Sequence, residues 1–531
     1  MPALRFDLRM RQLVPAVATE SSTEPGGSPS GSRRAFLASA AGVGVASVAG
    51  CLDRSGGGDG DGEDREYGPP GWKTYRGDRR RTGLASPDAG PGSSLSVAWE
   101  TSVFDVAESQ MDGSLADAAQ PDGENQFEGT AHCSDVSLTE ELVVCTAYYQ
   151  LPDGDAHHDW GGIVALDAET GSIEWTVGGI PPRMQAPSIV GQHAVLPVRY
   201  PVDEGQGAHL LVVDTASGSV ERRAQFPWDL GSTTSTITPD AAYLSPRSDT
   251  DGTVAALNPE TGAERWSVDA PFPIAEYWAF TVAGDSIVYA GKLGEETRLL
   301  VALDTATGEE LWRRTLQIPS LSVGRGDLLG APTIVDGRGY VTTGERAYVG
   351  RTRWGSSLRS FEASDGSPRW QFLPDGVPVD DMPSNWHQLH NCAERSSCSL
   401  SESYAGLRGV PLVVDDRVVV PGIGLPASNA GSHDEYQHLY AVEDADGSLA
   451  WSVPGTFGSA VAAGDVLYAQ KDETAVVAVS ADGELLDTVE TVKGPSRVPS
   501  PSVGHGRLYT QWGNGGSSST PGRAHTVVAL E

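Results

Sequence analysis

Lysine is almost absent from this sequence, which has only four among 531 residues. Acidic residues outnumber basic ones by 71 to 37, and the formal net charge at pH 7 is -34. A chain with this charge has no basic face for phosphate groups, which argues against nucleic acid as a partner. Molar salt shortens the Debye length to about 3 Å and screens repulsion between carboxylates. The composition therefore predicts a salt-adapted protein from an extreme halophile.

No hydrophobic run is long enough for a typical membrane span. The apolar stretch 35–50 consists largely of small residues, and it follows Arg33 and Arg34 in a pattern that matches a twin-arginine export signal. We therefore expect residues 1–50 to be a signal peptide and the mature protein to act outside the cytoplasm.

This stretch ends in a sequence similar to a lipobox, Val48-Ala49-Gly50-Cys51. In such a sequence the cysteine thiol takes a diacylglyceryl group, and two acyl chains together hold a protein stably at a membrane. Residues 51–68 are rich in glycine and aspartate, as expected for a flexible acidic tether. We expect Cys51 to anchor the protein to the outer face of the cell membrane and to provide its only membrane contact.

Cysteine is scarce as well. Once Cys51 is assigned to lipid, the remaining cysteines are Cys133, Cys145, Cys392 and Cys398. An oxidising exterior permits two disulfides, one between Cys133 and Cys145 across a hairpin and one that closes a short loop between Cys392 and Cys398. The alternative for Cys392 is a free thiol or a metal ligand beside His387 and His390, although such a site lacks a fourth ligand.

A repeated hairpin pattern organises the chain. In its clearest copy, 163–166 is apolar, 167–171 has the residues of a tight turn, and 173–177 alternates apolar with polar residues. An aspartate accepts backbone N–H groups within such a turn, and a glycine adopts the positive φ that closes it. Seven copies are identified by their turn glycines: Gly171, Gly218, Gly262, Gly308, Gly366, Gly447 and Gly483. Their spacing brackets the length of one four-stranded propeller blade.

A second hairpin precedes each of these, for example at 331–341 and 410–420. Two hairpins give a four-stranded sheet, which buries both faces only by stacking on its neighbours. The C-terminal copy, 501–531, lacks an outer strand, and 95–101 supplies one with Trp99 at the expected position. The sequence predicts an all-β, eight-bladed propeller in which this N-terminal strand joins the C-terminal blade and closes the ring. An open solenoid or two separate sandwiches would not explain why the two ends complement each other.

Together with the lead-in from Trp72 to Asp78 and the following Thr82 and Gly83, these repeats resemble the PQQ-like β-propeller repeat proteins. The resemblance covers residues 69–531. This family includes quinoprotein alcohol dehydrogenases and the non-enzymatic outer-membrane assembly lipoprotein BamB, so it implies a fold and leaves the function open. The dehydrogenases commonly carry two adjacent cysteines, whereas this chain has no such pair and no Cys-x-x-Cys-His haem motif.

Long connections are expected on only one face of the ring. Turns within hairpins are tight in nearly every repeat, whereas the segments that join hairpins or middle strands are long. The long segments are 104–130, 150–161, 200–208, 346–355, 374–406, 425–437 and 513–525. In or beside them are aromatic and histidine side chains suited to a binding face: Trp160, His157, His158, Trp354, Trp386, His387, His390, Tyr436 and Trp512. The alternative is that these side chains pack beneath their own loops.

Two functions are consistent with these features. In the first, the propeller is a monomeric, non-enzymatic binding or scaffold module that holds a protein partner, a small molecule or a glycan on its loop-rich face. In the second, it is a quinoprotein dehydrogenase with PQQ at the mouth of the channel, Ca²⁺ polarising the quinone and an aspartate as general base. We expect the first, because the motifs around a dehydrogenase's cofactor ligands match no position in this chain. No catalytic or metal-binding residue is assigned.

Overall fold

The computed structural model describes most of the propeller strands and their tight turns. The described residues are 76–102, 130–150, 160–180, 186–199, 208–225, 234–245, 252–270, 280–293, 297–316, 331–343, 357–372, 404–407, 409–425, 438–472, 474–490, 501–513 and 523–531. The predicted signal peptide, Cys51 and the acidic tether lie outside these residues. No helix within the described ranges has the length and hydropathy needed to cross a membrane.

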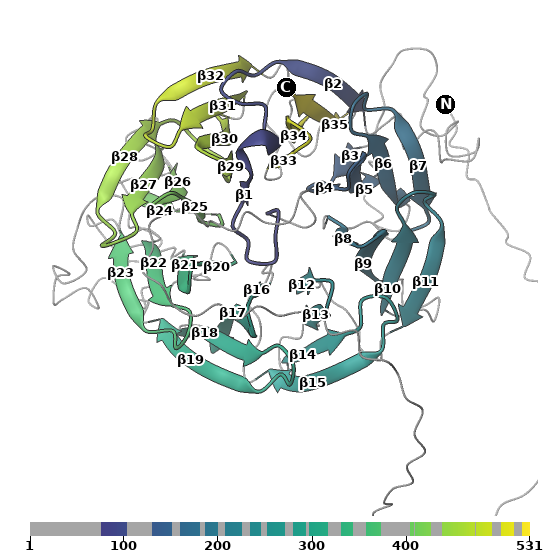
Figure 1. Ribbon diagram of the computed structural model, residues 1–531, viewed down its shortest axis with the longest axis horizontal. Coiled ribbons are helices and arrows are strands. Elements are labelled where there is room, and N and C mark those ends of the chain that lie inside the picture. Colours follow the sequence, from purple (N-terminus) through teal and green to yellow (C-terminus); the bar gives the residue numbers. More distant parts are fainter. Residues whose placement is uncertain are drawn as a thin grey trace, which may run out of the picture. The chain divides into compact units, whose positions relative to one another are not determined.

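Eight antiparallel blades surround a central axis, each with four strands that run from the axis outward (Figure 1). The first two blades are β4 (Ser137–Leu138), β5 (Leu142–Gln150), β6 (Trp160–Asp167) and β7 (Ile173–Gly178), then β8 (Ser188–Val190), β9 (His193–Arg199), β10 (Ala208–Asp214) and β11 (Val220–Gln225). The third and fourth are β12 (Thr234–Ile237), β13 (Ala242–Ser245), β14 (Gly252–Leu257) and β15 (Glu264–Ala270), then β16 (Thr281–Ala283), β17 (Ser286–Leu293), β18 (Thr297–Asp304) and β19 (Glu310–Leu316).

The remaining blades follow the same order. The fifth and sixth are β20 (Thr333–Val335), β21 (Arg338–Thr343), β22 (Ser357–Glu362) and β23 (Pro368–Phe372), then β25 (Leu412–Val414), β26 (Arg417–Leu425), β27 (His438–Glu443) and β28 (Leu449–Pro454). The last two are β29 (Val461–Ala463), β30 (Val466–Lys471), β31 (Ala475–Ser480) and β32 (Leu485–Glu490), then β33 (Ser502–Gly504), β34 (Arg507–Gly513), β35 (Arg523–Leu530) and β2 (Val97–Ser102). The predicted all-β, eight-bladed propeller is confirmed.

The turn between the third and fourth strands of a blade has the chemistry that its sequence predicts. In blade 1, Oδ1 of Asp167 accepts hydrogen bonds from the backbone N and the hydroxyl of Thr170, both at 2.7 Å. Gly171 closes the turn with a φ of +74°. The carboxylate thus holds the turn from within, and the glycine supplies the left-handed backbone conformation.

Each outer-strand tryptophan joins its blade to the next one. The indole Nε1 of Trp312 in blade 4 donates to the carbonyl of Ala363 in the turn of blade 5, at 3.0 Å. Gly366 of that turn lies directly against the ring, where an added Cβ would be 2.6 Å from it. The same indole-to-carbonyl bond is made by Trp99, Trp175, Trp266, Trp370 and Trp451. Tryptophan and turn glycine recur together because they are two halves of one contact between blades.

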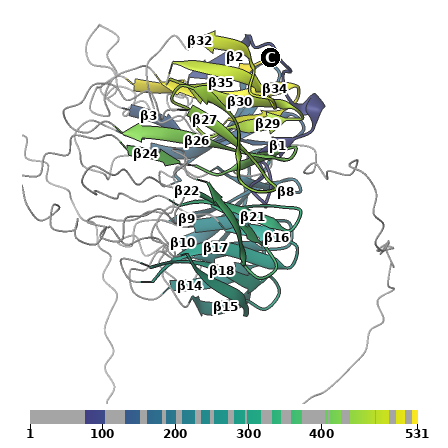
Figure 2. The ribbon, with the colours of Figure 1, turned by 90° about the vertical axis from the view of Figure 1, so that its left-hand side faces the viewer.

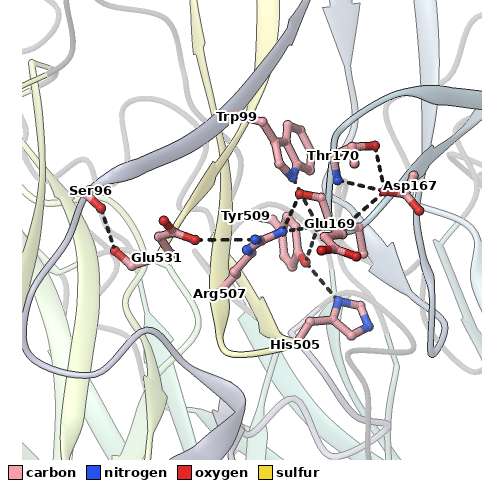
Figure 3. A network of polar contacts seen from close by, with 10 residues as sticks. Ser96, Trp99, Asp167, Glu169, Thr170, His505, Arg507, Tyr509 and Glu531 are labelled. Atoms are coloured by element: carbon pink, nitrogen blue, oxygen red, sulfur yellow. Dashed lines mark hydrogen bonds and ion pairs between the residues drawn. The ribbon is translucent and has the colours of Figure 1, made fainter.

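The two ends of the propeller share blade 8. Strand β2 pairs antiparallel with β35, and Trp99 lies opposite Ala529. Figure 3 shows the contacts that then join blade 8 to blade 1, where Trp99, Arg507 and Tyr509 all donate to the carbonyl of Ala168. The donor–acceptor distances are 3.1, 2.6 and 3.4 Å. One turn carbonyl of blade 1 is thus held by three side chains from blade 8.

Candidate functional site

The segment 76–85 crosses the axis of the ring (Figure 1). Its backbone carbonyls accept hydrogen bonds from the inner strands of separate blades. Val282 N of blade 4 donates to Arg79 O at 2.9 Å, and Ile334 N of blade 5 donates to Arg80 O at 3.2 Å. On the far side, β1 (Leu84–Ala85) pairs in parallel with β29 of blade 7. We call residues 76–85 the axial segment.

Arg76 has its guanidinium at the junction of blades 6 and 7. It donates to the carbonyl of Ala460, and also to those of Val410 at 3.2 Å and Pro411 at 3.4 Å. The side chain is only 1% exposed. A buried guanidinium needs acceptors for its N–H groups, and here backbone carbonyls of two blades provide them.

A belt of hydroxyl groups explains why Arg76 lies at this junction. At the equivalent position of the inner strand, a serine or threonine donates to the carbonyl that precedes the equivalent residue of the next blade. Five such hydrogen bonds join Ser137 to Pro187, Thr236 to Phe280, Thr281 to Pro332, Thr333 to Pro411 and Ser502 to Val136. Blades 6 and 7 have Leu412 and Val461 at this position and no hydroxyl to offer, and at blade 6 Arg76 donates instead to the corresponding carbonyl of blade 7, that of Ala460.

The axial segment lies at the end of the ring that carries the short turns. Arg79 forms an ion pair at 3.9 Å with Asp240, which is in the turn between β12 and β13. The N–H of Gly464, in the turn between β29 and β30, donates to Ala85 O at 3.1 Å. Figure 2 shows β1 at this end of the propeller. Approach to the axis from the turn face is therefore obstructed by the chain itself.

At the opposite end, two inner hairpins extend further than the others as far as the described ranges reach. Strand β24 (Tyr404–Leu407) pairs with residues 422–425 of β26, and β3 (Thr130–Cys133) pairs with residues 147–150 of β5. Figure 2 shows β3 and β24 on the side away from β1. The two faces of the ring therefore differ: one has short turns and the axial segment, and the other has the extended hairpins of blades 1 and 6.

The titratable side chain of His438 lies at this second face. The sequence reasoning did not select this residue. It begins β27, in the blade with the extended β24–β26 hairpin, and its ring lies 5.5 Å from that of Tyr440. Burial lowers the pKa of His438, so the imidazole is neutral at neutral pH. Its Nδ1 has no hydrogen-bond partner within the described part of the chain.

Most of the predicted binding-face residues lie outside the described residues. These are His157, His158, Trp354, Trp386, His387, His390 and Tyr436, together with Cys392 and Cys398. The backbone of Trp160 begins β6 opposite Tyr149. Trp512 is described: it is 5% exposed within the hydrophobic core of blades 7, 8 and 1, which favours packing within the protein over a place on the binding face. It lies inside β34, on the same side of the strand as the buried Leu508, and not in the loop that follows.

Cys133 and Cys145 are both buried thiols in this structure. Burial raises the pKa of Cys133, and a hydrogen bond with the thiol of Cys145 raises it further. The two cysteines that the sequence paired are thus neighbours in the structure, and their disulfide stays a prediction.

The described residues at the axis do not fit PQQ with Ca²⁺. An anionic quinone needs cationic partners, but Arg76 and Arg81 are both 1% exposed and are engaged with the ring, with Arg81 donating to Thr236 Oγ1 at 2.6 Å. Within the described ranges, no group of three His, Cys, Asp or Glu side chains is placed to hold a metal ion. Sequence reasoning missed both arginines, although four arginines within 76–81 form a conspicuous cluster in so acidic a chain.

Comparison with known proteins confirms the resemblance to PQQ-like propellers. The family model described as outer membrane protein assembly factor BamB matches residues 250–385. Polyvinylalcohol dehydrogenase of Sphingopyxis sp. (strain 113P3) is 24% identical over 466 residues, which cover 82% of this chain and 57% of that protein. The chain thus spans little more than half the length of this relative.

One solved structure shows the same fold. A europium-containing methanol dehydrogenase is similar with a TM-score of 0.56 and 10% identity, over 87% of this chain and 98% of the other. BamB from Moraxella catarrhalis has 16% identity and a TM-score of 0.35, over 64% of this chain and 99% of the other. At these identities the likeness concerns the fold alone.

Proposed function

We propose that this PQQ-like propeller is a lipid-anchored, non-enzymatic binding module outside the cell. It holds a protein, small-molecule or glycan ligand on the face opposite the axial segment, which we call the open face. The observation that carries this proposal is the difference between the two faces of the ring. The axial segment takes up the axis at the turn face, so a ligand reaches the axis from the open face.

The open face is also where the connections with predicted binding residues begin and end. Strand β5 ends at Gln150 and β6 begins at Trp160, so the segment with His157 and His158 leaves the extended hairpin of blade 1. Strand β26 ends at Leu425 and β27 begins at His438, so the segment with Tyr436 leaves the extended hairpin of blade 6. Binding surfaces of this kind favour aromatic anchors on loops positioned by a rigid scaffold.

A deletion tests the open face. Removal of residues 380–400 is expected to leave the thermal unfolding transition unchanged and to abolish capture of the partner from a membrane extract. As a matched control, Asp285→Asn on the turn face leaves capture intact. Capture that survives the deletion, or that is lost equally in the control, contradicts the proposal.

A dehydrogenase is the second candidate, favoured by the similarity to polyvinylalcohol dehydrogenase over 82% of this chain. The mature domain, in molar salt with Ca²⁺, is titrated with PQQ while tryptophan fluorescence is followed, and dye-linked oxidation of polyvinyl alcohol and of short alcohols is then measured. The binding-module proposal expects neither saturable quenching nor turnover. Saturable binding with turnover overturns it and establishes a quinoprotein enzyme.

A further inference from the structure

Residues 130–136 belong to two blades at once. Strand β3 pairs antiparallel with β5 of blade 1, and Cys133 lies opposite Ala147. The same strand pairs in parallel with β35 of blade 8, with Thr130 opposite Arg523. This short strand therefore makes one continuous sheet from blades 8 and 1.

The residues after β3 continue the contact with blade 8. Gln511 Nε2 of β34 donates to Ser134 O, and Ser502 Oγ of β33 donates to Val136 O at 3.0 Å. On the axis side of the seam, blade 8 thus holds blade 1 through residues 130–136. Their contacts with blade 8 stabilise the ring only if residues 130–136 are themselves firmly attached to β5.

Two cysteines lie where this segment meets β5. Cys145 is two residues from Ala147, the partner of Cys133, so both side chains are on the same side of the sheet. Their exposed fractions are 0% and 1%. The thiol of Cys145 is a hydrogen-bond neighbour of the thiol of Cys133.

We propose that Cys133 and Cys145 form a disulfide that locks residues 130–136 onto β5 and thereby strengthens the seam between blades 8 and 1. Each thiol loses its proton, a bond forms between the two sulfurs, and the two electrons pass to a disulfide oxidant, which is reduced to two thiols. Exchange proceeds through a thiolate, and burial disfavours the thiolate of Cys133 in the folded protein. Both cysteines are buried in the folded protein, so the bond forms during folding, before the sulfurs are enclosed, and is shielded from reductant afterwards.

Peptide mapping tests the bond directly. The full chain is refolded in molar salt with oxidised glutathione, alkylated in denaturant without reductant, and digested with Glu-C protease, which cleaves after Glu140 and Glu141 between the two cysteines. We expect one disulfide-linked pair of peptides, which separates into two alkylated peptides only after reduction. Free, alkylated Cys133 and Cys145 in the unreduced sample overturn the proposal.

Thermal unfolding tests its role at the seam. The paired variant Cys133→Ala/Cys145→Ala is compared with Cys392→Ala/Cys398→Ala, each denatured with and without reductant. Reductant is expected to lower the unfolding midpoint of the second variant and of the parent by about 2–5 °C, and to lower that of the first variant by less, because only the pair Cys392 and Cys398 remains in it. An equal effect of reductant on all three proteins contradicts a lock between these cysteines.

Discussion

Arg76 contributes to stability by donating to the backbone carbonyls of Val410, Pro411 and Ala460, of which that of Pro411 also accepts from Thr333. Replacement by methionine keeps much of the volume but removes every donor. We expect Arg76→Met to lower the free energy of unfolding by about 2–4 kcal/mol, because buried acceptors are left without hydrogen bonds. Urea unfolding measures the change, and Arg222→Met on the exposed outer strand β11 is the control. Equal losses in the two variants would show that the belt does not depend on Arg76.

The turn aspartates make the stability of the protein depend on pH. Hydrogen bonds from the hydroxyl and backbone of Thr170 lower the pKa of Asp167, and Ser217 and Thr307 do the same for Asp214 and Asp304. Because these pKa values are lower in the folded than in the unfolded state, their contribution to stability is complete above the unfolded-state pKa. It is lost as the pH falls through the folded-state pKa.

Substitution by asparagine separates the hydrogen bond from its charge. Asn258 already accepts the N–H of Thr261 at 2.7 Å in the equivalent turn of blade 3. We therefore expect the triple variant Asp167→Asn/Asp214→Asn/Asp304→Asn to fold normally and to lose less thermal stability than the parent as the pH drops below about 4. Calorimetric scans across this range measure the difference, and superimposable pH profiles would refute the assignment.

At the scale of the blade, the pair of tryptophan and turn glycine is a recurring contact between neighbouring sheets. An alanine at Gly366 has its Cβ 2.6 Å from the Trp312 ring and also requires a φ of +70°. Gly284 has a φ of +55° but no heavy atom within 4 Å of such a Cβ. At both glycines an alanine must adopt a positive φ, which costs free energy. Only at Gly366 does its Cβ also collide with a neighbouring side chain.

We expect Gly284→Ala to cost about 1–2 kcal/mol and Gly366→Ala to cost about 1–3 kcal/mol more, through overpacking against the indole. Urea unfolding of both variants, with and without Trp312→Leu, measures the cost of the positive φ and the cost of the contact with the indole. The extra cost of Gly366→Ala should shrink once the indole is gone. An undiminished cost in the Trp312→Leu background would place the strain in the turn itself or against Arg314 Cγ, which is also 2.6 Å from such a Cβ.

The blades could be predicted from sequence because their signals are local and repeated. The turn around Asp167 and Gly171 and the alternation before Trp175 lie within a few residues of one another, and most copies restate them. Trp512, a binding-face candidate, lies near the end of β34, and sequence patterns locate the boundary between a strand and a loop less reliably than the centre of a strand. Pattern alone did not distinguish the two.

For the whole molecule, the complementary ends were visible in the sequence, but the use of the axis was not. Arg76 meets Ala460 across 384 positions of the chain, and no repeat of this contact exists to reveal it. The missing hydroxyl at Leu412 gains meaning only when the other inner strands are superimposed on blade 6. Non-repeated, long-range contacts of this kind define the candidate site, which is why sequence predicted the scaffold better than the site.

Net charge acts on the ring as a whole. Besides the formal charge of -34, the exposed carboxylates of Asp285, Asp416 and Asp465 lie in the short turns of one face. At low salt their repulsion opposes the compact state, and it is screened as the Debye length falls from about 10 Å at 0.1 M to about 3 Å at 1 M. We expect the unfolding midpoint to rise steeply with KCl over this range, and to rise less in Asp285→Asn/Asp416→Asn/Asp465→Asn, which starts from a higher midpoint at low salt. A midpoint that is independent of salt in both proteins would show that the acidic surface does not govern stability.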